Sequence, residues 1–210
     1  MSGGRLPPWL LGLCLGWLGL ASPALAGPPP RPSAAATRAV EAEPLSAALA
    51  PLLHRSLGKP QLLGQAGFRY FGFSVYLAQL WVGQRPRDVQ WDWAQQPVVL
   101  SLQYQRDFKG EAIAQRSIEE MQRHPLMPVA AQDTWLQKLK EVLPDVREGD
   151  RLIGIYQPGA GLQVWHQSSQ LREVGSLPDP TLARVFMGIW LDPSTSAPEL
   201  RQRLLGLVPP

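Results

Sequence analysis

Cysteine is almost absent from this 210-residue chain, because Cys14 is the only one and lies in an apolar N-terminal stretch. We expect that stretch to be removed on export, which would leave the mature protein without a thiol. Disulfides, thiolate catalysis and cysteine metal sites are then excluded. His54, His124 and His166 are far apart, and none has a metal-ligand neighbour at helical spacing. We therefore predict no metal site and no cofactor.

The chain also has little excess of one charge over the other, since 20 basic and 17 acidic residues leave a formal net charge of +3. Such a weak and scattered balance argues against a nucleic-acid partner. Catalytic motifs are missing as well. Gly72–Phe73–Ser74 lacks the second glycine of a nucleophile elbow, and Gly159–Ala160–Gly161 lacks the third glycine of a dinucleotide loop. We accordingly predict no catalytic residue.

An export signal is predicted at the N-terminus. A short start ending in Arg5 precedes an apolar core over Trp9–Leu20, which is too short to span a bilayer. Ala24–Leu25–Ala26 has the small-x-small pattern of a cleavage site, so we expect cleavage after Ala26 and delivery to a bacterial periplasm. Residues 1–26 would then be the signal peptide and 27–43 a disordered linker rich in proline and alanine. Residues 44–210 would form a single domain.

The pattern of that domain predicts an α+β fold. Periodicity and turn residues indicate, in chain order, a helix over Leu45–Leu57, strands over Phe68–Val82 and Val98–Tyr104, a helix over Glu111–Arg123, a helix capped by Asp133, strands over Arg151–Gln157, Gly161–His166 and Leu171–Leu177, a helix capped by Asp179, and a last helix with a Ser196/Glu199 capping box. This order favours a large antiparallel sheet with a layer of helices on one face.

Arg69 is the first candidate for a binding role. It lies in the aromatic run FRYFGFSVYL, which we predict to be an inner strand covered on both sides. A buried guanidinium is costly unless an anion meets it, so Arg69 could receive a carboxylate or enolate oxygen in a cleft. The alternative is that its stem lies on aromatic surface while its head stays in water or pairs with a glutamate.

Tyrosine hydroxyls are the next candidates. Tyr70, Tyr76 and Tyr104 could each donate to the same anion as Arg69. Strand alternation places Tyr70 and Tyr76 on the face opposite Arg69, unless a bulge at Gly72 changes the register. We predict these four residues as the ligand-binding set.

Several segments, taken in order, resemble the chalcone isomerase-like family. LGQAGFRYFGFSVYLAQLWV is similar to the family's G-A-G-x-R…V-Y-x-A-x-L-Y segment. Further matches are LSLQYQRDFKGEAIAQRSIEEM, REGDRLIGIYQPGAGLQV and FMGIWLDPSTSAPELRQRLLG. Together they cover nearly all of residues 63–206, and they are most similar to the bacterial exported branch of the family.

The resemblance implies an open-faced sandwich with a cleft between the sheet and the helices. Plant members of the family close chalcones to flavanones, and non-catalytic members bind fatty acids in the same cleft. The resemblance also implies that Arg69 meets the ligand oxyanion. In the family a hydroxyl residue follows this arginine, and Phe71 aligns with it here. The plant enzymes also carry a tyrosine and an asparagine on the helix after the central strand. That helix has neither residue here, and Ser117 is its nearest polar candidate.

The functional expectation is an exported, non-catalytic protein that binds a fatty acid or another amphipathic carboxylate. One alternative is an isomerase or intramolecular lyase of the chalcone isomerase type, in which Arg69 stabilises an oxyanion. Another is a structural or partner-binding envelope protein with a filled core and a tryptophan-bearing contact loop over residues 83–97.

Overall fold

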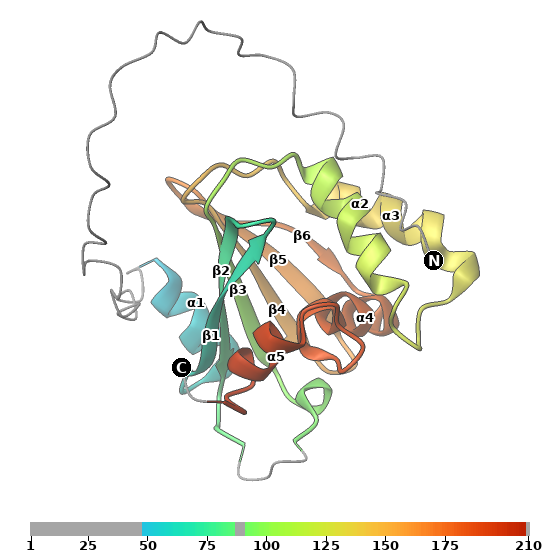
Figure 1. The fold of residues 1–210 in the computed structure, drawn as a ribbon. Coiled ribbons are helices and arrows are strands. Elements are labelled where there is room, and N and C mark those ends of the chain that lie inside the picture. Colours follow the sequence, from blue (N-terminus) through green and yellow to red (C-terminus); the bar gives the residue numbers. More distant parts are fainter. Residues whose placement is uncertain (1–47, 87–90, 209–210) are drawn as a thin grey trace, which may run out of the picture. The chain divides into compact units, whose positions relative to one another are not determined.

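Antiparallel strands form a six-stranded sheet in which every neighbour in space is also a neighbour in the chain (Figure 1). The computed structural model describes residues 48–86 and 91–208. The strands are β1 (Gln61–Tyr70), β2 (Phe73–Val82), β3 (Val98–Tyr104), β4 (Arg151–Gln157), β5 (Gly161–Gln167) and β6 (Leu171–Leu177). The predicted β3, β4 and β6 are confirmed at both ends, and β5 extends one residue further.

The described helices occur at three positions in the order of elements along the chain. The first precedes the sheet, two lie between β3 and β4, and two follow β6, in the order that the sequence predicts. They are α1 (Leu49–Leu57), α2 (Gly110–Met121), α3 (Gln132–Val142), α4 (Pro180–Leu191) and α5 (Pro198–Leu204), with short 3-10 turns η2 (Trp93–Gln95) and η3 (Val129–Ala131).

Side-chain alternation along β3 divides the interior into two cores. Val98, Leu100 and Leu102 belong to the larger core, which buries one face of the sheet against α2, α3, α4 and α5. Val99 points the other way, into a smaller core with Leu53 of α1. The predicted α+β fold with a helical layer on one face is therefore confirmed, and of the helices in the described residues only α1 covers the opposite face (Figure 1).

The predicted single strand over Phe68–Val82 is wrong. β1 ends at Tyr70, and a two-residue turn of Phe71 and Gly72 reverses the chain into β2. Both turn residues have positive φ, 46° and 81°, as the type I′ turn of a tight hairpin requires. Glycine adopts this conformation easily and phenylalanine rarely does, so the aromatic run hid the turn.

β1 is an edge strand, so the expectation that Arg69 lies on an inner strand is also wrong. The edge is partly covered by α5, which packs against β1. A Cβ atom on Gly64 would lie 2.0 Å from the Arg203 carbonyl oxygen of α5. This close backbone approach explains why a glycine stands inside the strand.

Helix capping is confirmed at one of three predicted positions. Asp179 Oδ1 accepts from the Thr181 and Leu182 amides, at 2.9 and 3.1 Å, and Pro180 opens α4. Asp133 lies inside the first turn of α3, whose N-cap is Ala131. The Ser196/Glu199 box is wrong too, because α5 begins after Ala197 without a side-chain cap.

The predicted signal peptide and linker lie outside the described residues. Across the ranges that are described, no helix is long and apolar enough to cross a membrane. The same ranges contain no group of three or more histidine, cysteine, aspartate or glutamate side chains that could hold a metal ion.

Candidate functional site

Aromatic rings from five segments meet between the sheet and the helices. We call Phe68, Tyr76, Tyr104, Phe108, Phe186 and Trp190 the aromatic cluster. Phe68 of β1 stacks on Tyr76 of β2 with ring centroids 5.1 Å apart, and Tyr76 meets Tyr104 of β3 edge-on at 6.0 Å. Phe108 continues the row, with its centroid 5.7 Å from that of Tyr104. The strand register explains this arrangement, because it pairs Phe68 with Tyr76 and Tyr76 with Tyr104.

Helix α4 contributes the last two members of the cluster, Phe186 and Trp190. The Trp190 indole N–H donates to the Tyr76 hydroxyl oxygen at 3.0 Å, and Phe186 meets Trp190 edge-on at 5.5 Å. Tyr76 therefore accepts one hydrogen bond and keeps its own proton to donate. The Tyr104 hydroxyl has no hydrogen bond to any described residue, although only 5% of this residue is exposed. The site thus offers two phenolic donors inside an apolar wall.

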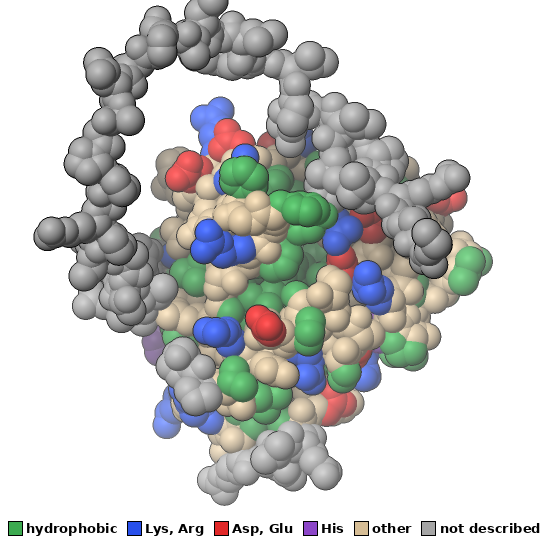
Figure 2. Space-filling model, viewed as in Figure 1, with side chains coloured by type: hydrophobic (Ala, Val, Ile, Leu, Met, Phe, Trp, Pro, Cys, Tyr) green, Lys and Arg blue, Asp and Glu red, His purple; other side chains and the backbone are tan. Residues whose placement is uncertain are grey.

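The cluster opens to the surface at one end. Tyr104, Phe186 and Trp190 are buried, whereas Phe68, Tyr76 and Phe108 are only half-buried. Figure 2 shows hydrophobic side chains on the floor of a hollow between the β1–β2 hairpin and α2. Concave, mostly apolar surfaces with a few convergent polar groups are typical of small-molecule sites.

Burial favours the protonated form of both phenols. Burial raises the pKa of Tyr76 well above its ordinary value of 10.0, while the hydrogen bond from Trp190 opposes this shift. Burial also raises the pKa of Tyr104, and nearby Tyr76 adds to the effect. A phenol with such a raised pKa can donate a hydrogen bond to an anion at neutral pH, but it is a poor candidate for a general base.

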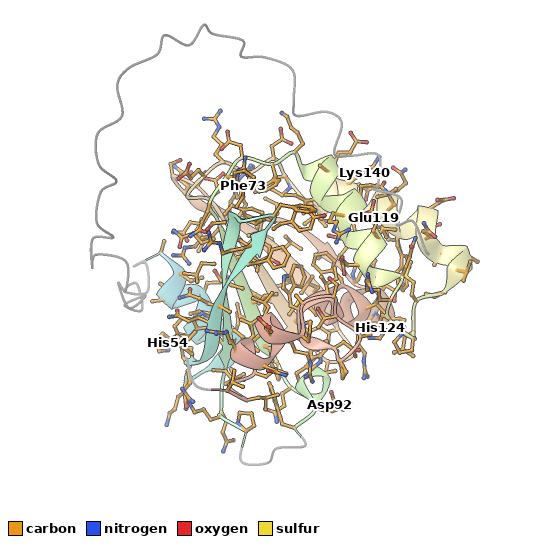
Figure 3. The ribbon with its side chains drawn as sticks, viewed as in Figure 1. His54, Phe73, Asp92, Glu119, His124 and Lys140 are labelled. Carbon is orange, nitrogen blue, oxygen red and sulfur yellow. The ribbon has the colours of Figure 1, made fainter. Side chains whose placement is uncertain are left out.

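Charged side chains of α2 form one wall of the site. The Arg116 guanidinium donates to Glu119 at 3.0 Å and also to Glu120. The side chain of Glu120 is only 9% exposed, and it lies 3.4 Å from Arg123. Glu120 helps to raise the pKa of Tyr76 and Arg116 lowers it, so both charges lie within electrostatic reach of that hydroxyl. Figure 3 shows Glu119 on α2, across the hollow from Phe73 at the hairpin end.

The four predicted ligand-binding residues fall into two groups. Tyr76 and Tyr104 lie together in the aromatic cluster. Arg69 and Tyr70 lie at the end of the β1–β2 hairpin, where the exposed Arg69 guanidinium donates to the Gly72 carbonyl oxygen at 2.9 Å. Because Arg69 is exposed, its charge needs no buried anion. The binding roles of all four residues stay predictions.

Sequence reasoning missed several members of the site. Phe68 and Phe108 were interpreted only as parts of a strand and a loop, and Arg116 as part of a polar helix. Trp190 lies in the helix capped by Asp179, and no motif in the sequence marked it as part of a site. Ser117, the nearest polar residue on α2, donates to the Ile113 carbonyl oxygen of its own helix at 2.8 Å.

A second, open pocket includes Phe108 in its lining. Most of its lining is polar or charged, and its members include Lys109, Asp145, Arg147 and His166. Lys109 pairs with Asp145 at 2.6 Å, and His166 pairs with Asp150 at 3.0 Å. These internal pairs satisfy much of the charge in this pocket, and Phe108 is the one phenylalanine, tyrosine or tryptophan among the lining residues.

Comparisons with known proteins agree with this architecture. An uncharacterized protein of Haemophilus influenzae is 26% identical over 146 residues, which cover 70% of this chain and 68% of that protein. The solved structure of an Arabidopsis thaliana fatty-acid binding protein is similar with a TM-score of 0.52. That similarity covers 71% of this chain and 88% of the plant chain at 15% sequence identity, and it therefore shows the fold.

The family of chalcone isomerase-like proteins matches residues 56–206, a span that begins in α1 and ends just after α5. It includes every strand of the sheet and all the members of the aromatic cluster. The chain therefore belongs to the chalcone isomerase-like family.

Proposed function

We propose that this protein binds a fatty acid or another amphipathic carboxylate without transforming it. The carboxylate would accept hydrogen bonds from Tyr76 and Tyr104, and the hydrocarbon part would lie against Phe68, Phe108 and Trp190. The observation that carries this proposal is the pair of phenols, Tyr76 and Tyr104, which meet edge-on inside a half-buried aromatic wall. The fatty-acid binding protein of the same fold gives independent support.

The chemistry of the site favours binding over catalysis. The resemblance aligns Phe71 with a hydroxyl residue of the family's enzymes, and Phe71 lies exposed in the hairpin turn. Ser117 bonds to the backbone of its own helix. The remaining hydroxyls belong to phenols whose raised pKa suits them to donate hydrogen bonds.

Two places compete for the carboxylate, and variants separate them. Tyr76→Phe or Tyr104→Phe would each remove one donor to a charged group, which is worth about 1.5–3 kcal/mol. We expect acyl affinity to fall roughly 10- to 150-fold in either variant. Arg69→Ala would cause the same loss if the hairpin end, and not the hydroxyl pair, holds the carboxylate.

The experiment is a titration of the delipidated protein with a long-chain fatty acid, preceded by native mass spectrometry of the protein as purified. A stoichiometric acyl carboxylate on the purified protein would identify the ligand class. Tyr156→Phe is the matched control, because this buried tyrosine donates to the Ala94 carbonyl oxygen at 3.2 Å, outside the aromatic cluster. A bare protein without acyl affinity would refute the proposal and favour a partner-binding role with a filled core.

Export is part of the proposal. The apolar core over Trp9–Leu20 and the Ala24–Leu25–Ala26 pattern support cleavage after Ala26 and a periplasmic location. Cell fractionation with mass determination of the intact chain tests this directly. A cytoplasmic protein that retains Met1–Ala26 would contradict it without affecting the binding proposal.

A further inference from the structure

The end of the β1–β2 hairpin exposes two large apolar side chains. Phe71 is 67% exposed and Phe73 is 61% exposed, only two residues apart in the chain. We call Arg69, Tyr70, Phe71, Phe73 and the neighbouring Arg106 the hairpin tip. Single exposed apolar residues are common on soluble proteins, but two exposed phenylalanines so close together at a hairpin end suggest an interaction surface.

Phe71 is held in a conformation that its own backbone disfavours. Its φ of 46° makes it the one non-glycine residue with positive φ in the described part of the chain. Bulky residues avoid this region, and a type I′ turn usually has asparagine or aspartate before the glycine. The only ring that Phe71 meets among the described aromatics is that of Tyr70, at 4.6 Å. Neither the turn nor the core therefore explains a phenylalanine here.

Two arginines belong to the hairpin tip. Arg69 donates to the Gly72 carbonyl oxygen and so braces the turn. The Arg106 guanidinium lies 4.8 Å from the centre of the Phe73 ring. The adjacent acid, Asp107, has one carboxylate oxygen bound to the Glu148 amide at 2.8 Å. Exposed aromatic rings with flanking arginines match the layers of an anionic lipid surface, which is apolar beneath and negatively charged outside.

We propose that the hairpin tip docks onto an anionic lipid bilayer. Phe71 and Phe73 would enter the boundary between headgroups and acyl chains, while Arg69 and Arg106 would pair with lipid phosphates. Such a contact accounts for the strained phenylalanine, because its ring becomes buried only when the protein is on the membrane. The tip also lies next to the hollow of the aromatic cluster, since Phe68 precedes Phe71 by three residues.

Phe71→Asn provides a sharp test, because asparagine suits a type I′ turn and the hairpin should keep its shape. The protein and this variant, purified identically so that they share one N-terminus, would be sedimented with phosphatidylcholine vesicles with and without phosphatidylglycerol. We expect binding to require phosphatidylglycerol and to fall at least about ten-fold in Phe71→Asn. Arg106→Gln should weaken it about five-fold.

Val129→Ser is the matched control, since Val129 is 89% exposed but lies in η3, away from the hairpin. It should leave vesicle binding unchanged. The proposal is overturned if the protein ignores anionic vesicles, or if Phe71→Asn binds them as well as the parent does. Self-association that is lost in Phe71→Asn, without vesicle binding, would instead assign the tip to a second copy of the chain. Fatty-acid affinity in solution should be the same in all these variants, so the binding proposal stands or fails separately.

Discussion

Replacing Gly64 by alanine tests how closely α5 packs on the edge of the sheet. The new Cβ atom would lie 2.0 Å from the Arg203 carbonyl oxygen, 2.5 Å from the Leu204 oxygen and 2.8 Å from the Leu204 carbonyl carbon. All three atoms belong to the backbone, so no side-chain rotation can relieve the overlap. Either α5 moves away from β1 or the edge strand bends.

The expected loss in the free energy of unfolding follows from the side chains that α5 buries. Leu200 is 6% exposed and Leu204 is fully buried, and such side chains contribute about 1.5–3 kcal/mol each. A gap of about 0.5–1 Å already forfeits a quarter to a half of the packing energy of the atoms that face it. We therefore expect a loss of about 1–3 kcal/mol in the free energy of unfolding, or roughly 2–12 °C in Tm for a domain of this size.

Thermal and urea unfolding of Gly64→Ala would measure this loss, and hydrogen exchange should show faster opening of α5. Gly67→Ala is the matched control in the same strand, because its Cβ atom would meet nothing within 4 Å. It should be neutral, or stabilising by up to about 1 kcal/mol through the reduced entropy of the unfolded chain. Equal Tm values for the two variants would refute the close approach of α5.

Three further predictions concern the stability contributions of His124, Asp179 and Trp190. Burial lowers the pKa of His124 from 6.5, and its Nδ1 accepts from the Leu126 amide at 3.1 Å, so protonation favours the unfolded state. The contribution of His124 to the free energy of unfolding should be fully present above pH 6.5 and should decline as the pH falls below this value. Urea unfolding at a series of pH values would measure it. Asp179→Ala should cost about 1 kcal/mol in the same assay by removing the cap of α4. Trp190→Phe should cost about 1 kcal/mol by removing the hydrogen bond to Tyr76.

Controls make these outcomes specific. His124→Asn keeps an acceptor near the Leu126 amide but cannot titrate, so the decline in stability with falling pH should become shallower. An unchanged pH profile would contradict the assignment to His124. Asp179→Asn preserves a capping oxygen and should lose little stability. Equal losses in Asp179→Asn and Asp179→Ala would mean that the hydrogen bonds to the α4 amides contribute nothing.

The correctly predicted elements depend on short-range signals. Asp179–Pro180 marks the start of α4 within two residues, and Pro158–Gly159–Ala160 marks the hairpin between β4 and β5. The β1–β2 hairpin was missed because Phe71–Gly72 is not one of the usual type I′ pairs, and the aromatic run continues through it. That error also placed Arg69 on an inner strand, when it lies at the end of an edge strand.

The sequence by itself determined the class of the fold, since alternating and helical periods indicated most elements and their buried faces, although not the β1–β2 hairpin. It also identified Tyr76 and Tyr104 as candidates from their residue type. Only the tertiary structure decided their partners. Tyr76 and Trp190 are 114 residues apart in the chain, and their hydrogen bond forms because α4, which packs on β4, β5 and β6, brings Trp190 to Tyr76 of β2. The local pattern of the sequence cannot predict such a contact, because the contact depends on how α4 packs against the sheet.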